Sequence, residues 1–119
     1  MHRFTRLAGL AAALAFVGAT QAQAHAHLVS TTPAEKTTVA SPTAITLRFN
    51  EKLEPKFSGF EVTDPRNVVV KLKTSVAQDG VSLVGAPAKA LSPGAYKVIW
   101  HAVAGDGHRM EGTYSFTVR

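Results

Sequence analysis

The chain has 119 residues, of which 45% are hydrophobic and 18% charged, with a formal net charge of +5 and no cysteine. This length accommodates one domain, and the lack of cysteine excludes a disulfide framework, thiolate metal sites and thiol nucleophiles. The apolar fraction is too high for a disordered chain, so a single packed core is expected.

The first 24 residues have the pattern of a secretory signal peptide. Two arginines precede an apolar run over residues 7–17, and Ala-Gln-Ala at residues 22–24 has the small-x-small pattern of a signal-peptidase site. The run is shorter than the roughly 20 apolar residues that span a bilayer, which disfavours a retained anchor. We therefore predict a cleaved signal over residues 1–24 and a mature domain over residues 25–119, exported to the periplasm.

Removal of this signal would lower the net charge to +3, because it contains two arginines and no acid. The remaining basic residues are scattered singly, without a basic run or interleaved stacking aromatics. Nucleic-acid binding is therefore not expected.

Beyond residue 25, apolar and polar residues alternate with a period of two wherever a period is clear, as in a strand with one buried face. No window of helical length has an apolar stripe of period 3.6. About seven short strands separated by Gly, Pro, Asn and Asp turns predict an all-β fold, a two-layer antiparallel β-sandwich. The clearest predicted strands are residues 44–50, 60–63, 68–73, 81–84, 95–101 and 113–118, with loops over residues 52–57 and 85–89.

The aromatic residues of the last two predicted strands alternate with polar ones, which favours core packing over an aromatic ligand groove. They are Tyr96, Trp100, Tyr114 and Phe116. His101 lies on the strand face opposite Trp100, and we predict a structural or surface role for it.

A mature chain that begins at His25 would present an α-amine and an imidazole on one residue. These two groups can close a chelate ring on a metal ion, and both can lose their protons to a strongly binding metal near neutral pH. Nitrogen ligands joined by one or two oxygens favour Cu(II), or less often Ni(II). His25 is thus the first candidate ligand.

Asp106-Gly107-His108, before the last predicted strand, is the second candidate. Glycine on both sides of Asp106 lets the backbone turn sharply, so that its carboxylate and the His108 imidazole can converge on one point. Taken alone, the same residues are also typical of an ordinary hairpin turn followed by an exposed histidine. The histidines at the mature N-terminus favour the metal-binding interpretation.

His27 leaves two geometries open. Residues two apart on a strand point to the same side, so His27 could join His25 against the Asp106 loop. Alternatively, a free amine with histidine at the third position can bind Cu(II) locally through ionised backbone amides, which Ala26 permits. A role beside the site, without metal contact, is the third possibility.

The mature sequence resembles the CopC family of periplasmic copper-binding proteins. The resemblance is carried, in order, by His25 with Leu28-Val29-Ser30, Thr32-Pro33-Ala34, Leu47-Arg48-Phe49-Asn50-Glu51, Phe57-Ser58-Gly59, Leu91-Ser92-Pro93-Gly94, Tyr96 to Trp100, and Asp106-Gly107-His108. It implies a cupredoxin-like or immunoglobulin-like sandwich or barrel, of the Greek-key type. It also implies one Cu(II) ion held by His25, Asp106 and His108, with Glu51 near the metal.

Two departures from the family pattern matter. Many members have a methionine-rich loop that binds Cu(I), whereas the mature chain contains only Met110, so a second, Cu(I) site is not expected. Arg109 follows His108 where proline is frequent in the family, which leaves the loop less rigid and places a cation near the metal. Glu51 follows Phe49 by two residues, so it would need a positive partner such as the metal or a metal-bound histidine if it pointed inward.

The resulting hypothesis is an exported, non-enzymatic Cu(II) protein that buffers copper or passes it to a CopD-like inner-membrane partner. Two alternatives stay open at this point. A copper oxidase or mono-oxygenase could use the same N-terminal histidine chelate, although an anionic Asp106 ligand disfavours copper reduction. A sandwich that serves only protein interaction would bind no copper tightly.

Overall fold

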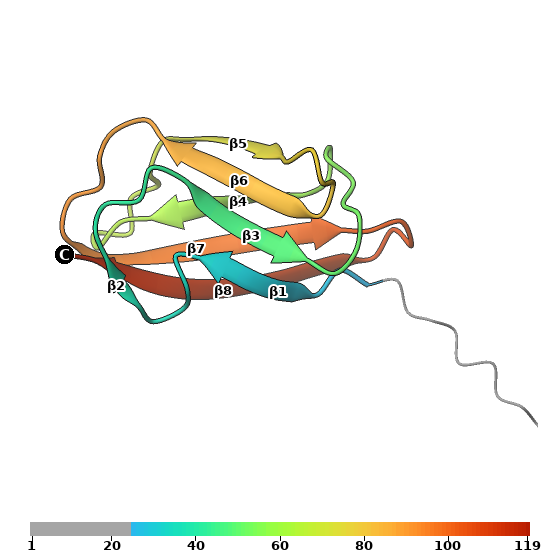
Figure 1. Ribbon diagram of the computed structural model, residues 1–119, viewed down its shortest axis with the longest axis horizontal. Helices are drawn as coiled ribbons and strands as arrows, with labels where there is room; N and C mark the ends of the chain where they lie inside the picture. The colour runs from blue at the N-terminus through green and yellow to red at the C-terminus, as the bar shows by residue number, and fades with distance from the viewer. Residues whose placement is uncertain (1–24) are drawn as a thin grey trace, which may run out of the picture.

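The computed structural model describes residues 25–119, so the predicted signal peptide lies outside the described residues. Eight strands account for the regular structure of this part of the chain (Figure 1). They are β1 (Leu28–Thr32), β2 (Thr38–Val39), β3 (Ile45–Phe49), β4 (Gly59–Thr63), β5 (Leu72–Val76), β6 (Ser82–Pro87), β7 (Gly94–Val103) and β8 (Arg109–Val118). Over residues 25–119 no helix is long and apolar enough to cross a membrane.

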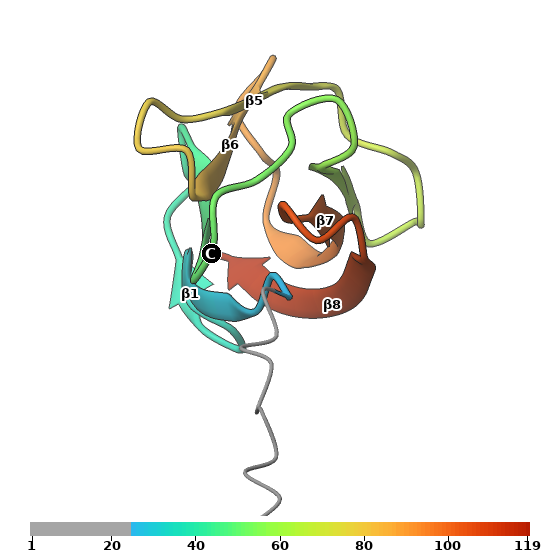
Figure 2. The same ribbon diagram turned by 90° about the vertical axis from the view of Figure 1, so that its right-hand side faces the viewer.

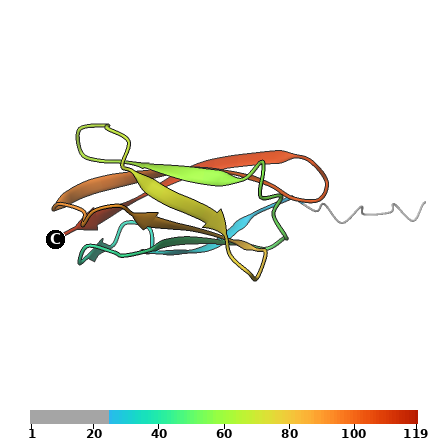
Figure 3. The same cartoon turned by 90° about the horizontal axis from the view of Figure 1, so that it is seen from above.

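The strands form two four-stranded sheets, which lie face to face as the two layers of Figures 1 and 3. One sheet has the order β1-β3-β6-β5 and the other β2-β8-β7-β4. The predicted all-β sandwich is therefore confirmed, and the two sheets do not close into a barrel. All pairings are antiparallel except that of β2 with β8, which joins only two residue pairs.

The core lies between the two sheets and is built from the alternating apolar residues of β3, β7 and β8, as the period of two predicts. Phe49 and Trp100 meet across it edge to face, with ring centroids 5.1 Å apart. The four aromatic residues predicted for the core are all buried: Tyr96, Trp100, Tyr114 and Phe116. Burial of each large side chain contributes about 1.5–3 kcal/mol, so these strands hold the two layers together.

The predicted strand over residues 68–73 is wrong in its first half. The Asp64 carboxylate accepts hydrogen bonds from the amides of Arg66 and Val68, at 2.8 and 3.0 Å, and closes a loop that continues past the expected strand start. Val68 and Val69 are consequently 58% and 57% exposed. Regular pairing begins only at Leu72, the first residue of β5.

The predicted loop over residues 85–89 is also wrong at its start, because β6 continues to Pro87. Gly85 pairs with Ile45 and Thr74 of the neighbouring strands. A Cβ atom at this position would lie 2.5 Å from Cζ of Phe60, so the glycine makes room for an aromatic ring of the other sheet and marks no turn. The predicted loop over residues 52–57 contains no strand, as expected.

The longest pairing in the molecule is the hairpin of β7 and β8, which runs from Gly94 opposite Val118 to Val103 opposite Arg109. Its turn reaches the end of the sandwich at which β1 begins and the loop after β3 passes (Figure 2). Three segments far apart in the sequence therefore meet at this end, which we call the N-terminal end.

Candidate metal centre

The turn between β7 and β8 is fixed by its own hydrogen bonds. The Gly107 amide donates to the carbonyl of Ala104 at 3.0 Å, and the His108 amide donates to Oδ1 of Asp106 at 3.1 Å. Gly107 has a φ of 78°, a left-handed conformation that glycine adopts without strain. This turn holds the Asp106 carboxylate and the His108 imidazole side by side, as the sequence predicts.

The segment before β1 brings His25 to the same place. Oδ1 of Asn50 accepts a hydrogen bond from the His27 amide at 2.6 Å, and the Asn50 amide donates to the His27 carbonyl at 3.1 Å. Ala26 between the two histidines is fully buried. The backbone that follows His25 is thereby tied to the end of β3, and the His25 side chain faces the β7–β8 turn.

The side chains of His25, Asp106 and His108 converge on one carboxylate oxygen. Oδ2 of Asp106 lies 2.6 Å from Nδ1 of His25 and 3.1 Å from Nδ1 of His108. The two imidazole rings are 4.8 Å apart between centroids and inclined by 56°. One donor atom from each residue falls within 4.8 Å of the others, and within residues 25–119 no other group of His, Cys, Asp or Glu side chains does this.

The Nδ1 atom of His25 is buried and has no hydrogen-bond partner. Its 2.6 Å contact with Oδ2 of Asp106 is an ion-pair contact that does not meet hydrogen-bond geometry. A buried polar atom without a partner is costly, and a cation accepted between Nδ1 and the carboxylate would satisfy it. The nitrogen and oxygen donors present here fit Cu(II).

Asp106 is held in its ionised form. Partial burial works against the charge, but the His108 amide, the His108 side chain and the nearby charge of His25 outweigh it and lower the pKa of Asp106. The carboxylate side chain is 21% exposed and that of His108 is 70% exposed. The donors thus form a site that is open to solvent on the His108 side.

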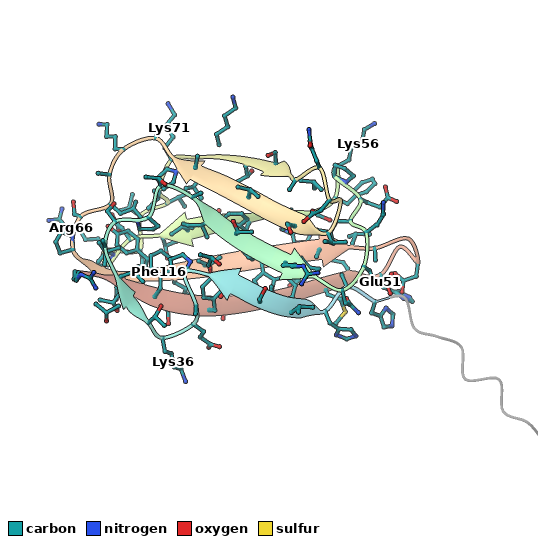
Figure 4. The ribbon with its side chains drawn as sticks, in the orientation of Figure 1. Lys36, Glu51, Lys56, Arg66, Lys71 and Phe116 are labelled. Atoms are coloured by element: carbon teal, nitrogen blue, oxygen red, sulfur yellow. The ribbon has the colours of Figure 1, made fainter. Side chains whose placement is uncertain are left out.

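His27 and Glu51, the two further candidates, are not brought into this group. The His27 side chain is exposed, and its backbone takes part in the pairing with Asn50. Glu51 is half-buried and lies at the N-terminal end, close to the turn in the view of Figure 4 but outside the three-residue cluster. Both therefore border the site in this structure.

Asn50 is the one contributor to the site that sequence reasoning missed. It belongs to the Phe-Asn-Glu segment from which the family resemblance singled out Glu51. Asn50 acts instead through two hydrogen bonds to the His27 backbone. The sequence feature that could have indicated this role is the position of Asn50 directly after a clearly alternating strand, where an amide side chain can extend the pairing by one residue.

His101 lies on β7, half-buried and outside the cluster. Burial lowers the pKa of His101, the Arg109 charge acts in the same direction, and Glu111 and Glu61 oppose them. The predicted structural or surface role agrees with this placement.

Comparison with known proteins places the chain in a family. The CopC domain family matches residues 28–119. The chain belongs to the CopC family. It is 43% identical over 99 residues to protein YobA of Escherichia coli (strain K12), a match that covers 81% of this chain and 80% of YobA. It is 38% identical over 119 residues to copper resistance protein C of Xanthomonas campestris pv. juglandis, covering 94% of this chain and 88% of the relative.

A solved structure is similar to this chain in both fold and sequence. The crystal structure of PcoC, a methionine-rich copper resistance protein from Escherichia coli, superposes with a TM-score of 0.75 at 38% identity. The superposition covers 81% of this chain and all of PcoC. The family resemblance drawn from the sequence is therefore confirmed, and the departure in methionine content stands, since Met110 is the sole methionine of residues 25–119.

One relative carries this domain inside a much longer chain. The copper transport protein CutJ of Bacillus subtilis (strain 168) is 30% identical over 98 residues, which is 80% of this chain but only 18% of CutJ. A domain of this kind is therefore physically joined, in that protein, to a far larger polypeptide.

Proposed function

We propose that this CopC-family chain binds one Cu(II) ion between His25, Asp106 and His108 and serves copper resistance. The observation that carries the proposal is the approach of two imidazole Nδ1 atoms to one carboxylate oxygen, with Nδ1 of His25 left without a hydrogen-bond partner. The copper-resistance names of relatives that align with most of the chain support copper as the ion.

The α-amine of His25 completes the proposed chelate. Cleavage after Ala24 would free this amine beside the imidazole of the same residue. The ion would then have five possible donor atoms around it: the amine nitrogen, two imidazole nitrogens and two carboxylate oxygens. Such a donor set is hard to intermediate in character and favours Cu(II) over Cu(I). Met110 alone supplies no soft cluster that would reverse this preference.

The exposure of the site supports exchange of copper with the surroundings. His108 is the most exposed of the three side chains, at 70%, so an incoming ligand can approach the ion from its side while His25 and Asp106 stay in place. We propose that the exported protein works in the periplasm, where it buffers copper or passes it to a CopD-like inner-membrane protein. Capture and exchange of the ion need no chemical turnover.

An oxidase or mono-oxygenase is the less favoured function. The family is one of copper-resistance proteins rather than enzymes. The anionic Asp106 contributes its oxygen to the same point as both imidazoles, which stabilises Cu(II) and works against the reduction that oxygen activation requires. Peroxide production by the copper-loaded protein with a reductant would distinguish the two functions, and the proposed binding function predicts none above free copper.

The site is tested by Cu(II) titration of the processed apo protein against a competing chelator. The variant is Asp106→Asn, and the matched control is Asp79→Asn, which removes the same charge from a similar turn in which the carboxylate accepts the Ser82 hydroxyl. We expect one tight equivalent in the wild type and the control, and an affinity lower by about tenfold or more in Asp106→Asn, since one ionised ligand is lost. Equal affinities in the two variants would refute the site.

A further inference from the structure

A hollow in the surface lies directly beside the proposed copper site. It has a volume of about 520 Å³ and is walled on one side by Gly105 and Gly107, the two residues that flank Asp106. We call it the loop groove. Its other main lining residues are Glu54, Lys56, Phe57, His101, Val103 and Arg109.

The wall opposite the metal loop is rigidly held. Leu53 forms a bridge with Ala104, the Glu54 amide donates to the Val103 carbonyl at 2.8 Å, and the Val103 amide donates to the Ser58 hydroxyl at 3.0 Å. Residues 53–58 are thus tied at both ends to the last residues of β7. The groove is preformed, and its walls are fixed with respect to the copper ligands.

Phe57 stands exposed on this fixed wall. Its side chain is 62% exposed, and its amide donates to the Glu54 carbonyl at 3.1 Å, so a tight turn holds it out of the core. An aromatic side chain displayed by an anchored turn next to a hollow is typical of a protein contact, in which aromatic anchors supply much of the binding free energy.

The charges at the groove are mainly positive. Lys56 forms no ion pair within residues 25–119, and it projects away from the sandwich at the N-terminal end in Figure 4. Arg109 is held by one contact, from Nε to Oε1 of Glu111 at 2.6 Å, and its other guanidinium donors stay available. Against these two cations the groove has one carboxylate, that of Glu54.

We infer that the loop groove is the docking face for the membrane copper-transport partner, and that it receives an extended segment carrying an apolar side chain next to a carboxylate. The apolar side chain packs on Phe57, and the carboxylate pairs with Lys56 and Arg109. This inference rests on the proposed function, because it names the surface through which the copper is handed on. A segment seated here would touch Gly105 and Gly107 and would therefore reach the ion at its open, His108 side.

The domain's place in CutJ supports this choice of partner. There a domain like this one occupies 18% of a copper transport protein, so it is covalently joined to a much larger chain. Val29, Val68 and Val69 are the other large apolar residues that are strongly exposed among residues 25–119, but none of them lines the loop groove. Of the strongly exposed large apolar residues among residues 25–119, Phe57 is the one that lines the groove beside Gly105 and Gly107.

The test uses the processed, copper-loaded protein and the purified CopD-like protein of the same organism in lipid nanodiscs, with empty nanodiscs as the blank. The variants are Phe57→Ala and Lys56→Glu. The matched control is Val68→Ala, which removes an equally exposed apolar side chain from the loop that contains Arg66, at the opposite end in Figure 4. We expect affinity for the nanodiscs to fall by about tenfold or more in both variants and to stay unchanged in the control.

Cu(II) titration of each variant separates this inference from the proposed function. Unchanged copper affinity together with lost docking supports the groove. Wild-type docking by Phe57→Ala and Lys56→Glu, or wild-type docking no stronger than to empty nanodiscs, would overturn the groove while leaving copper binding intact. Dimerisation of the wild type that Phe57→Ala abolishes would assign the groove to a second copy of the chain and overturn the inference as well. Loss of tight copper binding in the wild type would instead refute the proposed function.

Discussion

Asp79 and Asp106 occupy the same kind of turn. In each, the glycine that follows has a positive φ, of 75° and 78°, and donates its amide to the alanine carbonyl three residues earlier. In each, Oδ1 of the aspartate accepts the amide two residues later. The difference lies in Oδ2, which accepts the Ser82 hydroxyl at 2.8 Å in one turn and faces the two imidazoles in the other.

The Asp79 turn predicts a pH-dependent contribution to stability. Hydrogen bonds from the Ser82 side chain and the Val81 and Ser82 amides lower the pKa of Asp79 below its usual 3.8. A lowered folded pKa stabilises the native state above the unfolded pKa, and this contribution disappears as the pH falls through the folded value. Asp79→Asn should therefore destabilise the fold at about pH 7 and cost less at about pH 3, below the unfolded pKa. Urea unfolding at the two pH values measures this, and an equal cost at both would contradict the assignment.

The Asp106 turn predicts unequal effects of two glycine substitutions. Gly107→Ala forces a left-handed conformation on a residue with a Cβ atom, at a cost of about 1–2 kcal/mol, so the turn should relax and copper affinity should fall. Gly105→Ala is the control, because Gly105 has no positive φ and a Cβ atom at either position would meet no atom within 4 Å. Isothermal titration with Cu(II) compares them, and a weaker Gly105→Ala would show that the conformation of Gly107 does not set the site.

Two buried tyrosines should respond in opposite ways to removal of the hydroxyl. Burial raises the pKa of Tyr114 to about 12, and the Thr31 hydroxyl nearby offsets this only in part, since Oη has no partner in hydrogen-bond geometry. Tyr114→Phe should thus leave stability unchanged or raise it slightly. Tyr96→Phe removes a bond of 2.7 Å to the Ser92 carbonyl and should cost about 1 kcal/mol. Thermal unfolding of both variants measures the two changes in stability. A larger loss of stability in Tyr114→Phe than in Tyr96→Phe would contradict this prediction.

Copper itself should stabilise the folded chain. Because the three proposed ligands come from segments about 80 residues apart in sequence, they assemble only in the native state. Free Cu(II) at about 100 times the dissociation constant should add about 2.7 kcal/mol, which raises the melting temperature of a domain this size by about 10–20 °C. Calorimetry without copper and with free Cu(II) held at that excess measures the shift. No shift would indicate a site that the unfolded N-terminus can form alone.

Much of the fold was predictable because strands with one buried face leave a period of two in the sequence. Ile45, Leu47 and Phe49 fulfil this pattern and are all buried. The prediction failed at Val68, where the side chain of Asp64 binds the backbone locally and delays the strand. It failed again at Gly85, because this glycine makes room for the Phe60 ring of the other sheet within a strand. Interactions between side chain and backbone or between the sheets leave no periodic signal.

The three candidate ligands were also predictable, since residue type and spacing limit where a chelate can form. The sequence alone did not show the backbone pairing that determines whether His25 or His27 faces the Asp106 turn. The hydrogen bonds of Asn50 fix the His27 backbone, and they decide that His25 faces Asp106 while the His27 side chain is exposed. Such a choice depends on register between β1 and β3, which is a property of the assembled sheet.

The central claim is a copper site that joins the chain's N-terminal segment to the β7–β8 turn, and one comparison tests it most directly. It is the Cu(II) dissociation constant of the processed His108→Ala protein set against that of His27→Ala, by competition with a common chelator. Our account predicts that His108→Ala weakens binding by about tenfold or more and that His27→Ala has a much smaller effect. A local site of amine, backbone amides and His27 predicts the reverse. Nearly unchanged copper affinity in His108→Ala together with a large loss of affinity in His27→Ala would therefore contradict our account.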